Sequence, residues 1–199
     1  MREDGHRWFA SFYDRLSRSM ERGTMGRMRP RLLEGIAGDV VEIGAGTGLN
    51  FPHYPPSARV IAFEPDPHML RRAREHVTPG IDLRQAPGER IPLDDASADV
   101  VVSTLVLCTV DSQEQSLAEI RRVLRPGGEL RFIEHVRSTG VFGRVQDISQ
   151  PVWGQFSGGC HWNRRTEEAI AAAGFAFRTI EHTRLDGPMR AISGVAAPL

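Results

Sequence analysis

Two short stretches of the chain pair glycine with acidic residues in a way that could hold a nucleoside carrying a positive charge. In the first, a β-branched apolar run leads into three glycines at alternate positions, Gly44, Gly46 and Gly48. Glycine lets a backbone turn sharply and approach a ligand without a Cβ in the way. The spacing differs from the G-x-G-x-x-G of a dinucleotide site, and Glu42 suits a cationic, methionine-like group better than a pyrophosphate. We therefore predict a buried strand that ends in a ligand-binding loop, with a plain strand-to-loop turn as the alternative.

The second stretch places an acid twenty residues after the first of these glycines. Glu64 follows a predicted buried strand at residues 60–63, at the separation where a carboxylate accepts hydrogen bonds from both hydroxyls of a ribose. A solvated acid at a strand end is the alternative. Asp66 is the predicted N-cap and Pro67 the first residue of the helix that follows. The apolar face of that helix is predicted to contain Met69, Leu70, Ala73 and Val77.

Two histidines are the candidates for proton transfer, because histidine titrates near neutral pH. His135 follows a predicted strand end that should point into the cleft, and His161 lies in a glycine-rich loop that should face it. For each, a hydrogen-bonded structural histidine is the alternative. Cys108 fits a small buried residue better than a catalytic thiol. Together with Cys160 these residues have the types of a zinc site but no clustered spacing, so we predict no bound metal.

The elements that must position these residues alternate between strand and helix from residue 39 to 136. This alternation predicts a doubly wound α/β fold with a mostly parallel sheet of seven strands and right-handed crossovers. The predicted strands lie near 40–43, 60–63, 81–85, 99–106, 129–136, 175–182 and 192–197. The predicted helices lie near 6–19, 25–33, 67–77, 112–124, 142–156 and 166–173, the last one capped by Thr166 and ended by Gly174.

Composition sets the outer limits of the function. The 199 residues suit one domain (1–199), with a helical cap at 1–35 and an α/β core at 36–199. Twenty-five basic residues balance twenty-five acidic ones, so no global charge favours nucleic acid. Every basic residue is arginine, which excludes Schiff-base and P-loop lysine chemistry. Two cysteines and no long apolar run predict a soluble cytoplasmic protein without integral membrane association.

Several motifs of the chain resemble those of class I S-adenosylmethionine-dependent methyltransferases. They are E-I-G-A-G-T-G at 42–48, Glu64, P-G-E at 87–89 and R-R-V-L-R-P-G-G at 121–128. A narrower likeness is to the thiol methyltransferase-like family and to bacterial phospholipid N-methyltransferases. It rests on L-V-L-C at 105–108, E-H-V at 134–136 and the segment 150–164. The resemblance implies S-adenosyl-L-methionine as cofactor and a small-molecule acceptor.

Residues can also be assigned to the cofactor and to the acceptor. The resemblance implies that Gly88 and Glu89 lie beside the adenine, and the carboxyl end of the fourth strand lies where ligands bind in open α/β sheets. The predicted cofactor-binding residues are Glu42, Gly44, Gly46, Gly48, Asn50, Glu64, Pro65, Met69, Gly88, Glu89, Thr104 and Leu105. The predicted acceptor-binding residues are Phe12, Tyr13, His135, His161 and Trp162.

The segment 6–19 carries aromatic residues at helical spacing, which leaves three possibilities open. It is a helix packed on the edge of the sheet, a lid over the methyl donor with Phe12 and Tyr13 at the acceptor, or a peripheral membrane helix. Acceptor pockets depend on such variable segments, so the sequence specifies the cofactor better than the acceptor.

The predicted function is methyl transfer to a small molecule, with thiol sulfur as the first choice. N-methylation of a phospholipid amine and C- or O-methylation of a quinone or phenolic ring are the alternatives within the class. A noncatalytic cofactor-binding module is the alternative outside it. Nucleic-acid methylation is disfavoured because no N-P-P-Y or D-P-P-Y tetrad follows the fourth strand.

Overall fold

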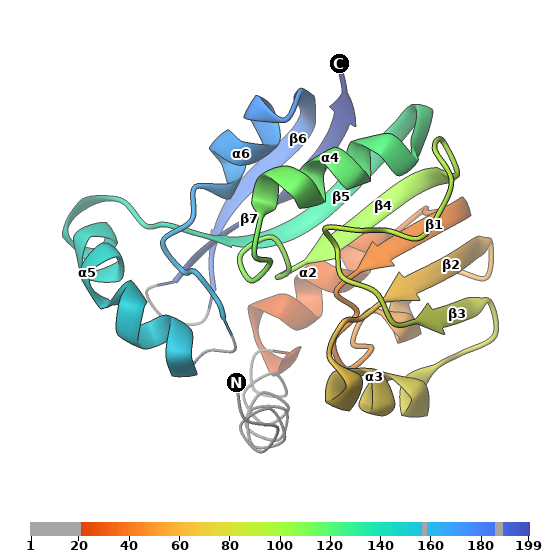
Figure 1. The fold of residues 1–199 in the computed structure, drawn as a ribbon, viewed down its shortest axis with the longest axis horizontal. Helices are drawn as coiled ribbons and strands as arrows, with labels where there is room; N and C mark the ends of the chain where they lie inside the picture. Colours follow the sequence, from red (N-terminus) through yellow and green to blue (C-terminus); the bar gives the residue numbers. More distant parts are fainter. Residues whose placement is uncertain (1–20, 157–158, 186–188) are drawn as a thin grey trace.

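The computed structural model describes residues 21–156, 159–185 and 189–199. Seven strands form one sheet in the order β3-β2-β1-β4-β5-β7-β6 (Figure 1). β7 runs antiparallel to both of its neighbours, and the other neighbouring strands pair in parallel. The strands are β1 Gly38–Ile43, β2 Ala58–Phe63, β3 Ile81–Arg84, β4 Ala98–Thr104, β5 Leu124–Val136, β6 Phe175–Arg184 and β7 Arg190–Pro198. The predicted α/β class and mostly parallel sheet are confirmed.

The helices between these strands are short, apart from one. They are α2 Thr24–Leu33, α3 Pro67–Ala73, α4 Gln113–Val123, α5 Gly140–Phe156 and α6 Thr166–Ala172, with 3-10 turns η1 Phe51–His53 and η2 Arg74–His76. Prolines at 52, 55 and 56 leave room for only the single turn η1 between β1 and β2. Among the described residues, no helix is both long and apolar enough to cross a membrane.

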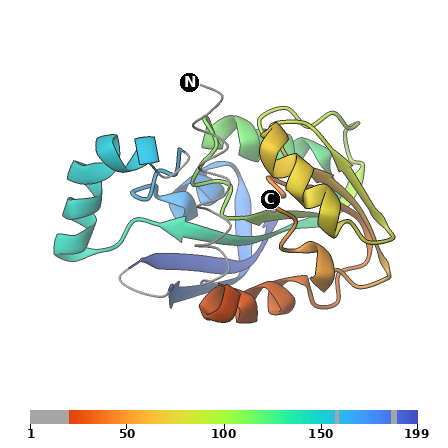
Figure 2. The same cartoon turned by 90° about the horizontal axis from the view of Figure 1, so that it is seen from below.

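Apolar side chains cover both faces of the sheet. On one face, Leu117 and Ile120 of α4 and Ile170 of α6 pack against strand residues such as Val101. On the other face, Met25 and other residues of α2 pack against the sheet, and Figure 2 shows α2 and α4 on opposite sides of it. α2 therefore covers a sheet face. The first part of the predicted cap, residues 1–20 with Phe12 and Tyr13, lies outside the described residues.

The register of the central strands brings their carboxyl ends to one edge. Ile43 at the end of β1 pairs with Phe63 at the end of β2 and with Ser103 near the end of β4. Ligands of open α/β sheets bind outside this edge, where the strand order changes direction. The glycine loop and Glu64 must therefore lie side by side.

Several predicted boundaries were wrong, each for a local reason. β4 ends at Thr104, two residues early, because Leu105 turns into the left-handed region with φ 59°. β5 begins at Leu124, and a register shift between Ala98 and Val100 accommodates the additional residues. The helix after β2 ends at Ala73, so Val77 lies outside it with 40% of its surface exposed.

The predicted cap of α6 was also wrong. Arg165 occupies the N-cap position, and Thr166 is the first helical residue. The Thr166 hydroxyl instead accepts a hydrogen bond from the Gln113 side chain at 3.1 Å. Gly174, with φ 80°, follows the helix as predicted.

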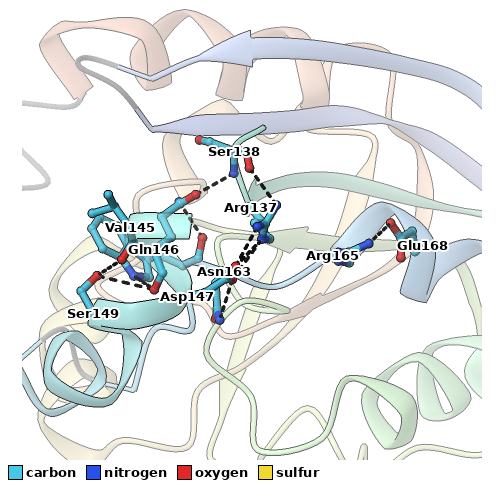
Figure 3. A network of polar contacts seen from close by, with 10 residues as sticks. Arg137, Ser138, Val145, Gln146, Asp147, Ser149, Asn163, Arg165 and Glu168 are labelled. Carbon is cyan, nitrogen blue, oxygen red and sulfur yellow. Dashed lines mark hydrogen bonds and ion pairs between the residues drawn. The ribbon is translucent and has the colours of Figure 1, made fainter. Parts of the chain in front are cut away.

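α5 stands away from the sheet (Figures 1 and 2), and Gln146 on its polar face is fully buried. Figure 3 shows Gln146 reaching Ser138, and Arg137 forming an ion pair with Asp147 at 2.7 Å. The Gln146 side chain accepts from the Ser138 N–H at 2.7 Å and donates to the Trp162 carbonyl at 2.8 Å. The opposite face exposes Val141, Val145, Ile148 and Val152. α5 is thus held by polar contacts to the segment after β5 and to the loop that precedes α6.

Candidate active site

The glycine loop is fixed by packing as well as by backbone geometry. A Cβ on Gly44 would lie 2.5 Å from Val106 Cγ2, and a Cβ on Gly48 would lie 2.7 Å from the Phe51 ring. Both glycines have positive φ, 59° and 81°, which L side chains rarely adopt. Around Gly46, by contrast, no described atom lies within 4 Å of an added Cβ. The loop is therefore closely packed at Gly44 and Gly48, and the space beside Gly46 is open.

Glu64 lies at the end of β2 with its carboxylate against this open space. Its Oε2 accepts from the Gly46 N–H at 2.7 Å, and its Oε1 accepts from the Asp66 N–H at 2.9 Å. Burial raises the pKa of Glu64 to about 7, against the lowering effect of these two bonds. A carboxylate has roughly four acceptor positions, so Glu64 retains capacity for two further donors.

Glu42 and Asn50 form the core of a buried polar network under the loop. Glu42 Oε1 accepts from Asn50 Nδ2 at 2.8 Å, and its Oε2 accepts from the Tyr54 hydroxyl at 3.0 Å. Asn50 Nδ2 also donates to Thr104 Oγ1 at 3.1 Å, and Asn50 Oδ1 accepts from Arg29 of α2 at 2.7 Å. Burial raises the pKa of Glu42 to about 7. These predicted cofactor residues therefore connect α2, the loop and β4.

Of the two residues predicted beside the adenine, Glu89 also binds a backbone N–H group. Glu89 Oε1 accepts from the Asp111 N–H at 2.8 Å, which holds the start of α4. Gly88 is buried near Ile43, where an added Cβ would lie 3.7 Å from Ile43 Cδ1.

The start of α3 is fixed by the predicted cap. Asp66 Oδ1 accepts from the N–H groups of His68 and Met69 at 2.7 and 3.0 Å. The carbonyl of Pro65 accepts from the Gln85 side chain at 3.0 Å. The cap predicted at Asp66 is confirmed, and Met69 lies in the first turn of α3.

A buried carboxylate holds the loop that follows β4. Glu134 Oε1 accepts from the Ser103 hydroxyl at 2.6 Å and from the N–H groups of Val106 and Leu107 at 3.1 Å each. Its Oε2 accepts from the Cys108 N–H at 3.3 Å. Burial raises its pKa to about 7. Because Val106 also contacts Gly44, Glu134 fixes this loop directly against the glycine loop.

Beyond this loop the structure gathers two cysteines and two histidines. Cys160 Sγ lies 3.8 Å from His135 Nδ1, and the His161 N–H donates to the Cys108 carbonyl at 2.7 Å. The Cys108 thiol hydrogen-bonds to Cys160 and, with His135 and His161 nearby, lowers the pKa of Cys160 to about 5; the pKa of Cys108 is raised. His135 Nε2 and His161 Nδ1 are buried without a hydrogen-bond partner among the described residues. The two predicted catalytic histidines are thus brought to one cluster.

Trp162, predicted at the acceptor, belongs to the loop before α6 and packs against α5. Its ring packs edge-on to Phe142 with centroids 5.9 Å apart, and its Nε1–H donates to the Gln146 carbonyl at 3.2 Å. A separate cavity of about 470 Å³ lies between the end of β5, α6 and β6, with Arg137 and Arg190 in its wall. It includes neither the glycines nor Glu64, so we do not assign it to the cofactor. Among the described residues, no group of three or more His, Cys, Asp and Glu could hold a metal ion.

Comparison with known proteins identifies the domain. The sequence family described as a methyltransferase domain matches residues 41–132. An S-adenosylmethionine-dependent methyltransferase of Thermotoga maritima, described as a possible histamine N-methyltransferase, superposes with a TM-score of 0.73 at 21% identity. That likeness covers 98% of this chain and 99% of the other. Residues 41–132 therefore form a methyltransferase domain, and the chain has the class I, Rossmann-like fold of S-adenosylmethionine-dependent methyltransferases.

Two curated relatives carry the narrower likeness. The human thiol S-methyltransferase TMT1B is 41% identical over 161 residues, which cover 72% of this chain and 63% of that protein. The phosphatidylethanolamine N-methyltransferase of Cereibacter sphaeroides is 32% identical over 140 residues, covering 67% of this chain and 66% of that protein. The chain thus spans less than two thirds of the length of either relative. The predicted resemblance to both groups is confirmed.

The class implies S-adenosylmethionine as the cofactor, and the residues at the carboxyl edge fit it. The open space at Gly46 admits a ligand close to the backbone, and Glu64 retains acceptor positions for ribose hydroxyls. Thr47 Oγ1 is buried in the same loop without a hydrogen-bond partner among the described residues. The donors and acceptors of this edge therefore suit a nucleoside.

The sequence missed residues whose roles depend on the folded chain. Arg29 meets Asn50 from 21 positions away, and Glu134 holds N–H groups 26 to 28 positions earlier. The sequence suggests Cys160 as a zinc ligand and as part of the segment 150–164, but not as a partner of Cys108. The single signal for Glu134 was its place in the E-H-V segment of the narrower likeness.

Proposed function

We propose that the protein transfers a methyl group from S-adenosylmethionine to the sulfur of a small-molecule thiol. The observation that carries this proposal is the cluster of His135, His161 and Cys160 beside the loop after β4, in a chain 41% identical to a thiol S-methyltransferase over 161 residues. Cys108 and the segment around His161 belong to the motifs that carry the narrower resemblance, and they meet in this cluster.

The chain's own residues bind and orient both partners. We propose that the loop at residues 44–48 and Glu64 bind the nucleoside, with Glu64 accepting the ribose hydroxyls. The network of Glu42 and Asn50 holds the loop from below. When bound, S-adenosylmethionine supplies an electrophilic methyl group on a sulfonium. Alignment and exclusion of water can then provide most of the acceleration.

A thiol acceptor needs to lose only its own proton before it attacks the methyl group. A free thiol has a pKa of about 8.5, so a histidine that accepts its proton produces the thiolate near neutral pH. His135 Nε2 and His161 Nδ1 are the buried ring nitrogens without a described partner. We assign the proton to one of these two atoms, with the other orienting the acceptor.

The test measures S-adenosylhomocysteine formation with monothiols, dithiols, phosphatidylethanolamine, quinols and phenols between pH 6 and 9. We expect turnover with thiols that rises as they ionise. Turnover confined to phosphatidylethanolamine would overturn the thiol assignment in favour of the lipid amine, which the relative from Cereibacter sphaeroides supports.

His161→Ala provides the control for the site. We expect a turnover at least tenfold lower, in line with general base catalysis, and unchanged affinity for S-adenosylhomocysteine by calorimetry. Wild-type turnover in this variant would limit His161 to a structural role. Loss of both turnover and cofactor affinity would place it at the cofactor instead.

A further inference from the structure

Cys108 and Cys160 are positioned for a covalent step that methyl transfer does not use. They belong to two different loops, one after β4 and one before α6. The His161 N–H donates to the Cys108 carbonyl at 2.7 Å. With standard bond lengths this bond keeps the Cα atoms of Cys108 and Cys160 within about 7.5 Å. Natural disulfides join Cα atoms roughly 4.4–6.8 Å apart, so a small movement at most is needed.

The side chains already face each other. The two thiols hydrogen-bond, and Cys160 Sγ lies 3.8 Å from His135 Nδ1. Cys160 is partly exposed whereas Cys108 is buried. The pair therefore has the arrangement of an attacking thiolate at the surface and a resolving thiol behind it.

We propose that Cys108 and Cys160 form a reversible disulfide, with small-molecule disulfides as the oxidants. The Cys160 thiolate attacks one sulfur of the small-molecule disulfide, forms a mixed disulfide and releases one thiolate. Cys108 then attacks Cys160 Sγ, the second thiol leaves with the Cys108 proton, and the S–S bond joins the two loops. Two electrons pass from the cysteines to the oxidant, so the step balances.

The disulfide acts on the candidate acceptor site. It consumes the Cys160 thiolate beside His135 and ties the loop that carries His161 to the loop that Glu134 holds. We expect the oxidised protein to lose acceptor turnover by at least tenfold. This functional consequence rests on the proposed function, whereas the bond itself does not. An enzyme that methylates thiols would then stop when its acceptors are mostly present as disulfides.

The first measurement needs no methyl transfer. The full chain is equilibrated with oxidised and reduced glutathione, trapped with N-ethylmaleimide and digested with trypsin without reduction. Cleavage at arginine places Cys108 on the peptide 91–121 and Cys160 on the peptide 145–164, each with one cysteine. We expect the two peptides joined, two hydrogens lighter than their sum, and separated again by dithiothreitol.

Single substitutions separate the two roles. Cys108→Ser should give no cross-link but a glutathione adduct on peptide 145–164. Cys160→Ser should give neither a cross-link nor an adduct on peptide 91–121, because Cys108 is buried. Both cysteines recovered with N-ethylmaleimide after excess oxidised glutathione, or a cross-link only between two chains, would overturn the proposal.

The outcomes also distinguish this inference from the proposed function. A cross-link in a protein whose reduced form turns over no thiol leaves the disulfide standing and removes thiol methylation. Thiol turnover in the reduced protein without any cross-link removes the disulfide alone. Equal turnover in the reduced and cross-linked protein removes the proposed control of the acceptor site.

Discussion

Glu64 is the residue on which the cofactor assignment depends most directly. Its carboxylate bridges the N–H groups of Gly46 and Asp66, and thereby connects the glycine loop to the start of α3. Burial raises its pKa to about 7, so near neutral pH it exists in both protonation states. Only the ionised carboxylate offers both of its remaining positions as acceptors for hydroxyl donors.

We predict that Glu64→Ala weakens S-adenosylhomocysteine binding at least tenfold at pH 8. The variant loses two hydrogen bonds to a charged acceptor, each about 1.5 kcal/mol. The wild-type affinity should rise between pH 6 and pH 8 as Glu64 ionises, and the variant should lose part of this rise. Isothermal titration calorimetry measures both.

Glu75→Ala is the matched control, because Glu75 is an exposed acid on η2 after α3. Its affinity should equal that of the wild type. If Glu64→Ala also binds with wild-type affinity, the ribose lies elsewhere along the carboxyl edge.

At the scale of elements, α5 shows how hydrogen bonds can supplement sparse apolar packing. The helix contains Pro151 and several glycines, which are poor helix formers. Its buried face carries Gln146, whose side chain joins Ser138 to Trp162. Four of its aliphatic residues lie on the solvent side, where Ile148 is 81% exposed, and Phe142 packs against Trp162. Hydrogen bonds of its polar face, together with this one aromatic contact, therefore hold the helix in place.

We predict that Gln146→Ala destabilises the protein by about 1–3 kcal/mol, the cost of removing one partner from buried backbone groups. Ile148→Ala should change the stability by less than about 0.5 kcal/mol, as exposed substitutions do. Urea unfolding measures both. Equal effects of the two substitutions would mean that the exposed face of α5 is covered in solution.

The sequence predicted the elements whose signals are local. Continuous apolar runs located β1, β2 and β4, and alternate glycines with an acid twenty residues later located the cofactor edge. Asp66 followed by proline predicted the start of α3 correctly. The end of that helix was wrong because apolar spacing continues to Val77 while the chain tightens into η2.

The acceptor side could not be predicted in the same way. The cluster of Cys108, His135 and Cys160 joins a loop, a strand end and a second loop, up to 52 positions apart. No spacing rule relates such positions, because the contact forms only when the loop before α6 folds back onto the loop after β4, where the His161 N–H donates to the Cys108 carbonyl. The sequence offered the histidines from their type and their predicted places at a strand end and in a loop, and only the fold shows that Cys160 lies beside His135 and Cys108.

At the scale of the whole molecule, burial of acids couples stability to pH. Glu42, Glu64 and Glu134 lie at the ends of β1, β2 and β5, and burial raises the pKa of each to about 7 from 4.5. A raised folded pKa favours the protonated form in the folded state. Each group therefore contributes stability that is fully present below pH 4.5 and is lost as the pH rises to about 7.

Other titratable groups change the stability in a different pH range, or make it rise with pH instead of fall. Arg125 lowers the pKa of Asp39 and Asp99, so their contribution is lost only in acid below their ordinary pKa of 3.8. The lowered pKa values of His53 and Cys160 make stability rise with pH within the neutral range. The contribution of a single carboxyl to stability must therefore be measured as the difference in unfolding free energy between the wild type and a variant of that carboxyl.

Glu134→Gln isolates one of these carboxyls with little change in contacts. Glutamine can keep its Oε1 as acceptor for Ser103, Val106 and Leu107, and loses only the 3.3 Å contact to the Cys108 N–H. The wild type, but not the variant, pays for ionising a buried group as the pH rises. We predict that the stability of Glu134→Gln relative to wild type increases between pH 4.5 and 7 by up to roughly 3 kcal/mol, at 1.36 kcal/mol for each unit of pKa difference, and is constant above pH 8.

Urea unfolding of both proteins at intervals between pH 4.5 and 8.5 measures this difference. Contributions from His53, Cys160 and the other carboxyls are common to both proteins and cancel where they do not contact Glu134. A relative stability that stays flat with pH would mean that the three N–H groups and the Ser103 hydroxyl keep Glu134 ionised throughout. In that case the loop after β4 is held by a charged carboxylate, and the acceptor cluster beside it carries one more negative charge at neutral pH.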